Sequence, residues 1–120
     1  MSVEALVLVT DDDEDIRDTV ALVLEDAGYR VIVARDGAEA LSLARVRRPA
    51  LIILDLMMPT MDGLEFREHQ LRDPALADIP VLLFTAGMHD PARTPGIAGF
   101  IAKPVRLSDL LDAVAAHARP

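Results

Sequence analysis

Residues 51–63, with the sequence LIILDLMMPTMDG, decide the fold of this chain. The stretch starts with branched apolar residues over the length of a strand and reaches an acidic residue at Asp55. The pair Asp62 and Gly63 indicates a structural turn before the next helix. An apolar run without in-out alternation is typical of a strand that helices cover on both faces. The stretch therefore predicts an inner strand of a parallel sheet with a carboxylate at its carboxyl end.

Similar apolar runs alternate with longer stretches in which apolar residues recur every three or four positions. We expect strands at residues 5–10, 29–34, 51–55, 81–85 and 99–102. We expect helices between Asp13, as N-cap, and Gly28; at residues 36–47; at residues 63–71; and after Ser108, as N-cap, with Leu111, Val114 and Ala115 on its apolar stripe. With right-handed crossovers this pattern predicts an α/β fold, a doubly wound five-stranded parallel sheet in the order 2-1-3-4-5, which is flavodoxin-like.

The connection between the last two strands departs from the alternation. Gly87, Pro91, Pro95 and Gly96 lie close together there. Pro95 lacks the N–H that a continuing helix needs, so at most one turn is expected after Asp90. The fourth helix of such a fold is therefore predicted to be shortened or missing.

Length and composition bound the function. A chain of 120 residues fits one domain, residues 1–120, and 52% hydrophobic residues with 27% charged residues suit a folded chain. The apolar runs are too short to span a bilayer and no export signal is evident, so we expect a cytoplasmic protein without membrane contact. The absence of cysteine excludes disulfides and thiolate metal sites, and a net charge of −8 argues against direct binding to nucleic acid.

In a doubly wound sheet the ligand site lies beyond the carboxyl ends of the strands. The residues there are Asp11, Asp12, Asp55, Thr85 and Lys103. Three carboxylates (−3) and one ammonium (+1) sum to −2, which one divalent ion such as Mg²⁺ (or Mn²⁺) would cancel. Asp55 is central and is the candidate nucleophile for phosphoryl transfer, with Thr85 and Lys103 positioned to bind the phosphoryl oxygens.

Four segments in this order carry a family resemblance. They are residues 7–13 followed by Ile16 and Arg17, residues 51–63, residues 81–86 (VLLFTA) and residues 99–104 (GFIAKP). Over essentially its whole length the chain resembles the receiver domain of bacterial two-component response regulators.

The resemblance implies a phosphorylated Asp55 and a Mg²⁺ site. Asp12 would bind the metal directly, Asp11 would hold it through water, and the backbone carbonyl of Met57 would complete the protein ligands. Neither Met57 nor Gly87 carries a polar side chain that orders an attacking water, so hydrolysis of the acyl phosphate is expected to depend mainly on the metal.

The resemblance also implies a conformational switch. Thr85 and Lys103 would bind the phosphoryl group, Phe100 would swing inward when Thr85 moves, and a cis peptide would join Lys103 to Pro104. A histidine kinase or histidine phosphotransfer protein would donate the phosphoryl group, and a downstream protein or output domain would read the change. The chain would carry one phosphoryl group and lose it, rather than act as a turnover enzyme on an external substrate.

Two other functions compete with this interpretation. A metal-free pseudo-receiver would serve only as a docking module, and the shortened fourth helix favours such divergence. A phosphatase of the haloacid dehalogenase type would need an acid two residues after Asp55, where Met57 stands.

The resemblance places partner exchange on the fourth helix, the last strand and the last helix. Because the fourth helix is predicted to be shortened or missing, we do not expect the usual phosphorylation-dependent dimer.

Overall fold

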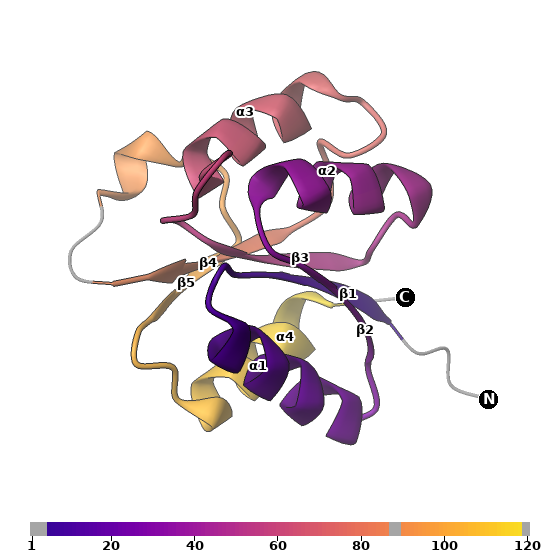
Figure 1. Ribbon diagram of the computed structural model, residues 1–120, viewed down its shortest axis with the longest axis vertical. Coiled ribbons are helices and arrows are strands. Elements are labelled where there is room, and N and C mark those ends of the chain that lie inside the picture. Colours follow the sequence, from indigo (N-terminus) through magenta and orange to yellow (C-terminus); the bar gives the residue numbers. More distant parts are fainter. Residues whose placement is uncertain (1–4, 87–89, 119–120) are drawn as a thin grey trace.

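The computed structural model describes residues 5–86 and 90–118, which form a parallel sheet covered by helices on both faces (Figure 1). The strands are β1 (Leu6–Thr10), β2 (Arg30–Ala34), β3 (Leu51–Asp55), β4 (Val81–Thr85) and β5 (Gly99–Ala102). The helices are α1 (Glu14–Asp26), α2 (Gly37–Val46), α3 (Gly63–Arg72) and α4 (Leu107–His117), and η1 (Pro91–Arg93) is a 3-10 turn. Every strand lies within one residue of its expected bounds.

The strand order is β2-β1-β3-β4-β5, as predicted. All neighbouring strands are parallel, and the central pair places Thr10 of β1 beside Leu54 of β3. Because parallel strands end at the same edge, the residues after β1, β3, β4 and β5 meet there.

Alternate residues of the inner strands supply two separate cores. On the face covered by α1 and α4, the buried cluster includes Val7, Val9, Leu51, Ile53, Leu82, Phe84, Leu24, Leu110 and Val114. On the face covered by α2 and α3, it includes Leu8, Ile52, Leu54, Val81, Leu83, Leu41 and Phe66. Figure 1 shows these two helix layers on opposite sides of the sheet. A strand that is buried on both faces needs apolar residues at every position, which explains the continuous runs.

Side-chain caps fix where three helices begin. The Asp13 carboxylate accepts hydrogen bonds from the backbone N–H of Asp15 (2.9 Å) and Ile16 (3.2 Å), so the expected cap of α1 is confirmed. Asp36 caps α2 and Asp62 caps α3 in the same way. These caps satisfy N–H groups that have no partner within the helix.

Gly63 allows the start of α3 to lie against the end of β3. A Cβ atom at this position would lie only 3.0 Å from the backbone oxygen of Asp55 and from the Cα of Leu56. The pair Asp62 and Gly63 is therefore structural, as expected, and brings α3 close to the site.

The beginning of α4 differs from the prediction. The helix starts at Leu107, and Arg106 is its N-cap without a side-chain hydrogen bond, so the expectation that Ser108 caps it is wrong. Its buried stripe is Leu110 and Val114, whereas Ala115 is exposed. Arg106 turns the chain while still extended, so the helix begins before the serine and Ser108 falls within its first turn.

The helix expected between β4 and β5 is reduced to the turn η1 in the described part of this connection, which confirms the predicted loss. Asp90 begins the turn by accepting a hydrogen bond from the Ala92 N–H at 3.0 Å. The last helix consequently carries the label α4. Across residues 5–86 and 90–118, no helix combines the length and apolar character that crossing a bilayer requires.

Candidate functional site

The carboxyl edge of the sheet gathers the predicted polar residues. Asp11 follows β1, Asp55 ends β3, Thr85 ends β4 and Lys103 follows β5. The β3–β4 register sets Asp55 beside Phe84, and the β4–β5 register sets Thr85 beside Ala102. The topology therefore brings together residues that are far apart in the sequence.

Three carboxylates form the carboxylate cluster, which consists of Asp11, Asp12 and Asp55. One oxygen from each lies within 4.8 Å of the others. The Lys103 ammonium contacts two of them, with Nζ 3.1 Å from Asp11 Oδ2 and 3.2 Å from Asp55 Oδ2. Asp11 and Asp55 are buried, whereas Asp12 is exposed, so the cluster is closed by the protein on one side and open to solvent on the other.

Local hydrogen bonds orient the two buried carboxylates. Asp11 Oδ1 accepts a hydrogen bond from the Asp13 N–H at 2.9 Å, and Asp55 Oδ1 accepts one from the Met57 N–H at 3.3 Å. Arg17, which belongs to the first of the four motif segments, donates from Nη1 to the Asp11 carbonyl oxygen at 3.1 Å. These bonds hold the remaining Oδ2 atoms toward Lys103.

Burial and charge oppose each other in the cluster. Burial raises the pKa of Asp55, and the negative charge of Asp11 raises it further, while Lys103 and the Met57 N–H only partly offset these effects. Burial alone would lower the pKa of Lys103, but its contacts with Asp11 and Asp55 and their negative charge outweigh it, so the pKa is raised. The ammonium is therefore held protonated between two carboxylates.

The residues present fit a hard divalent cation. Asp11 Oδ2 is buried and has no hydrogen-bond partner, although it lies within ion-pair distance of Lys103. Three carboxylates and one ammonium leave a local charge of −2, and all donors of the cluster are oxygens, which Mg²⁺ and Mn²⁺ prefer. Asp11, Asp12 and Asp55 are the side chains that could hold such an ion.

The other predicted residues lie around this cluster. Thr85 is buried, and its backbone oxygen accepts a hydrogen bond from the Lys103 N–H at 2.8 Å. Met57 has an exposed side chain, Phe100 lies on β5 with 42% of its surface exposed, and the peptide between Lys103 and Pro104 is cis, as expected. Gly87 lies outside the described residues. The roles of Met57 as a metal ligand and of Phe100 as a switch remain predictions.

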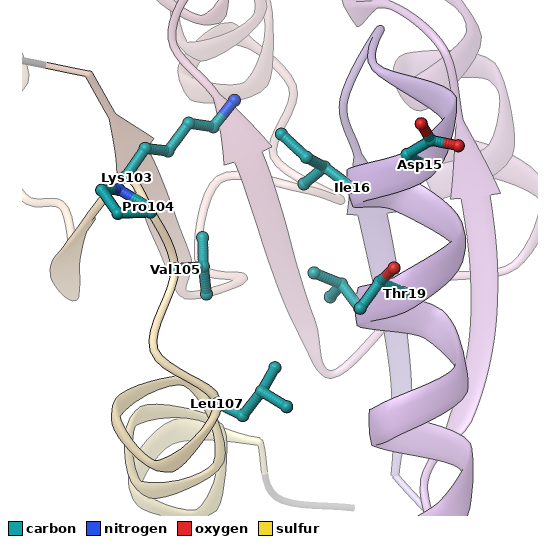
Figure 2. Close-up of a pocket in the computed structure, with 8 residues that line it drawn as sticks. Asp15, Ile16, Thr19, Lys103, Pro104, Val105 and Leu107 are labelled. Atoms are coloured by element: carbon teal, nitrogen blue, oxygen red, sulfur yellow. The ribbon is translucent and has the colours of Figure 1, made fainter.

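A hollow that sequence reasoning missed adjoins the cluster. It has a volume of about 280 Å³, and its lining comes from α1 and from the chain between β5 and α4: Asp15, Ile16, Thr19, Val20, Lys103, Pro104, Val105 and Leu107. Figure 2 shows Val105 and Leu107 facing Ile16 and Thr19 across it. Ile16 and Val20, four residues apart in the stretch between the first two strands, are an apolar pair that could have indicated part of this lining.

Comparisons with known proteins identify the family. The family model described as "Response regulator receiver domain" matches residues 7–115. The "Response regulator MprA" of Mycobacterium sp. (strain KMS) is 41% identical over 109 residues, which is 88% of this chain and 46% of that protein. The "DNA-binding dual master transcriptional regulator RpaA" of Synechocystis sp. is 39% identical over 117 residues, which is 94% of this chain and 48% of that protein. The chain thus spans about half the length of these curated relatives.

Solved structures agree with this assignment. The structure of the chemotaxis response regulator CheY4 of Vibrio cholerae aligns with a TM-score of 0.86 at 34% identity, covering 95% of this chain and 98% of that one. The chain belongs to the response regulator receiver domain family of two-component signal transduction. This assignment removes the haloacid dehalogenase-type phosphatase as an alternative.

Proposed function

We propose that this receiver domain accepts a phosphoryl group on Asp55 and acts as a signalling switch. The observation that best supports the proposal is the position of Lys103, within 3.2 Å of both buried carboxylates at an open acidic edge. A purely structural ion pair would not need a third carboxylate, Asp12, exposed beside it.

In the proposed reaction an oxygen of Asp55 attacks the phosphorus atom of the donor. A new oxygen–phosphorus bond forms, and the bond between phosphorus and the donor breaks, with its electron pair leaving on the donor. Lys103 then pairs with a phosphoryl oxygen, and the Thr85 hydroxyl donates to another. Mg²⁺ or Mn²⁺, held by Asp11, Asp12, Asp55 and the Met57 carbonyl, would supply positive charge that stabilises the equatorial oxygens.

The conformational response is proposed to pass through β4 and β5. Lys103 is hydrogen-bonded through its backbone to Thr85, and Phe100 lies three residues earlier on β5. A shift of Thr85 or Lys103 toward a phosphoryl group would therefore displace the strand that carries an exposed aromatic residue. We propose that a downstream protein or output domain reads this change, and that the domain is a phosphoryl carrier rather than a turnover enzyme.

We further propose that the phosphoryl donor, a histidine kinase or histidine phosphotransfer protein in the cytoplasm, contacts the hollow in Figure 2. This mainly apolar hollow includes Lys103, so a protein seated there is close to Asp55. Replacing the exposed Leu107 by Ser should slow transfer from a protein donor at least tenfold and leave phosphorylation by acetyl phosphate unchanged. Equal slowing with both donors would contradict this docking site.

The pseudo-receiver remains the alternative, and one experiment separates the two functions. The protein is incubated with Mg²⁺ and acetyl phosphate, and its mass is measured by intact-protein mass spectrometry. An Asp55→Asn variant and a sample with chelator are treated in the same way. We expect one phosphoryl adduct on the wild type with Mg²⁺ and none in the two controls. Absence of an adduct on the wild type would favour the pseudo-receiver.

A further inference from the structure

Arg67 on α3 is a buried cation outside the carboxylate cluster. Its exposed fraction is 8%. Nη1 donates to Gln70 Oε1 at 2.8 Å, Nη2 reaches the Pro95 carbonyl oxygen at 3.5 Å, and Nε is buried without a hydrogen-bond partner. Within residues 5–86 and 90–118, Arg67 forms no ion pair with a carboxylate. A guanidinium has five N–H donors, so these two protein acceptors satisfy less than half of its donor capacity.

This arrangement is electrostatically incomplete. Burial lowers the pKa of Arg67, because the guanidinium loses hydration. Its two acceptors, an amide and a peptide carbonyl, carry no charge. A buried charge without a counterion destabilises a protein, whereas the same charge paired with a carboxylate does so much less.

The guanidinium is held in place before any ligand arrives. Gln70 Nε2 donates to the backbone oxygens of Leu76 and Ile79, both at 3.0 Å. These two bonds fix the amide so that its oxygen faces Arg67. The charge is therefore pre-oriented rather than mobile.

Arg67 lines a groove of about 450 Å³, here named the α3 groove. Its lining residues are Leu64, Arg67, Glu68 and Leu71 from α3 and Arg93 and Pro95 from the β4–β5 connection. Leu71 is 48% exposed, and Arg93 is exposed as well. The groove lies between α3 and the segment that holds the turn η1, which Figure 1 shows beside α3.

The spacing of the α3 residues favours a helix as occupant. Positions 64, 67, 68 and 71 lie on one face of α3 at the i, i+3, i+4, i+7 spacing by which a helix packs against another helix, with a leucine at each end and the charged Arg67 and Glu68 between them. In a doubly wound fold the β4–β5 crossover helix would lie in this layer, and within residues 90–98 of this connection the helix is a single turn. The face of α3 is thus covered only in part, by the chain around Pro95, and Leu71 stays 48% exposed.

We propose that the α3 groove binds an amphipathic helix of a partner protein, in which a Glu or Asp within the apolar face pairs with Arg67 and Arg93. The apolar residues of the partner helix contact Leu64, Leu71 and Pro95. Glu68 repels a partner helix whose acidic residue would lie beside it rather than beside Arg67. This site is on a different part of the molecule from Asp55, and it does not depend on phosphorylation.

The test uses two model helical peptides with a leucine seam, identical except for one central Glu or Gln. They are titrated into the full ¹⁵N-labelled chain, and the Nε–H signal of Arg67 and the amides of residues 64–71 are followed by NMR. We expect the Glu peptide to shift these signals and to bind at least about tenfold more tightly than the Gln peptide.

Variants of the chain test the same contact. Arg67→Met should abolish the difference in affinity between the two peptides. If Arg67→Met does not fold, Arg93→Gln at the exposed rim tests the same contact and should lower the affinity for the Glu peptide. Glu68→Gln should raise the affinity for the Glu peptide about two- to fivefold, because it removes a negative charge beside Arg67. Arg72→Gln, on the same helix but outside the groove, is the matched control and should change nothing.

Four outcomes would overturn the proposal. They are no shift at millimolar peptide, equal binding of both peptides, shifts confined to the region of Phe100 and Leu107, and self-association of the chain through residues 64–71 without peptide. The last outcome would assign the groove to a second copy.

Discussion

The carboxylate cluster and Arg67 are two buried charged sites that are incomplete in opposite senses. In the first, Asp11 and Asp55 share the single ammonium of Lys103 and leave negative charge in excess. In the second, one guanidinium is buried against neutral acceptors. Negative charge is in excess at the first site and positive charge at the second, so the sign of the excess charge indicates the class of ligand that each would take.

The two sites also differ in how the sheet supports them. The carboxylate cluster lies at the ends of strands whose register is set by the core, so its residues are positioned by the whole fold. Arg67 is held by Gln70 and by the irregular chain at Pro95. Removing a charge should therefore have different consequences at the two sites, and the following predictions test that difference.

Lys103→Met should have the largest effect. Without Lys103 two buried carboxylates face each other, so the free energy of unfolding in chelator should fall by about 3 kcal/mol, and Mg²⁺ should restore part of it. Urea unfolding followed by circular dichroism measures both values. Lys103→Arg, which keeps the charge, is the control, and a loss below about 1 kcal/mol would contradict the account of the cluster.

Asp11→Asn should have the second largest effect, a weaker binding of Mg²⁺. Removing one of three carboxylates should lower the affinity for Mg²⁺ about 10- to 100-fold, as measured by calorimetry. Asp13→Asn is a matched control, because Asn also caps helices and Asp13 lies outside the cluster. An unchanged affinity in Asp11→Asn would place the metal elsewhere.

Arg67→Met should be nearly neutral for stability, in contrast to Lys103→Met. Replacing an uncompensated buried cation by an apolar side chain of similar length removes its desolvation cost, and it loses the hydrogen bond to Gln70 and the longer one to the Pro95 carbonyl. The free energy of unfolding should change by about 1 kcal/mol or less in the same urea assay. A loss as large as that of Lys103→Met would mean that native contacts already compensate the guanidinium.

Met57→Asn should have a small effect, on the lifetime of the acyl phosphate rather than on stability. The side chain at this position is exposed next to the site, and its N–H is bonded to Asp55. A polar side chain there should order an attacking water and shorten the lifetime of the acyl phosphate severalfold, as followed by the decay of the adduct mass. Met57→Leu is the apolar control, and an unchanged lifetime in Met57→Asn would refute the idea.

The sequence predicted the sheet and the carboxylate cluster well, for a physical reason. A parallel sheet buried on both faces demands uninterrupted apolar strands, and these locate Asp11, Asp55 and Lys103 at one edge without further information. The contact of one ammonium with both carboxylates depends on side-chain directions that spacing does not reveal.

Other features depend on contacts between distant parts of the chain. Ser108 has the composition of a cap, but the path of the chain through Arg106 starts the helix earlier. Arg67 occurs in a polar helix and would be expected at the surface, but the chain around Pro95 and the Gln70 amide enclose it. Both the start of α4 and the burial of Arg67 depend on contacts between residues that are distant in the sequence, and the local sequence pattern does not predict such contacts.

Chemical trapping of the acyl phosphate would identify the phosphoacceptor residue. The protein is incubated with acetyl phosphate and Mg²⁺, reduced with borohydride, which converts an aspartyl phosphate into homoserine, and mapped by peptide mass spectrometry. The account predicts homoserine at position 55 only when donor and Mg²⁺ are both present. Homoserine at Asp11 or Asp12, or none at any position, would contradict the assignment of Asp55 as the phosphoacceptor.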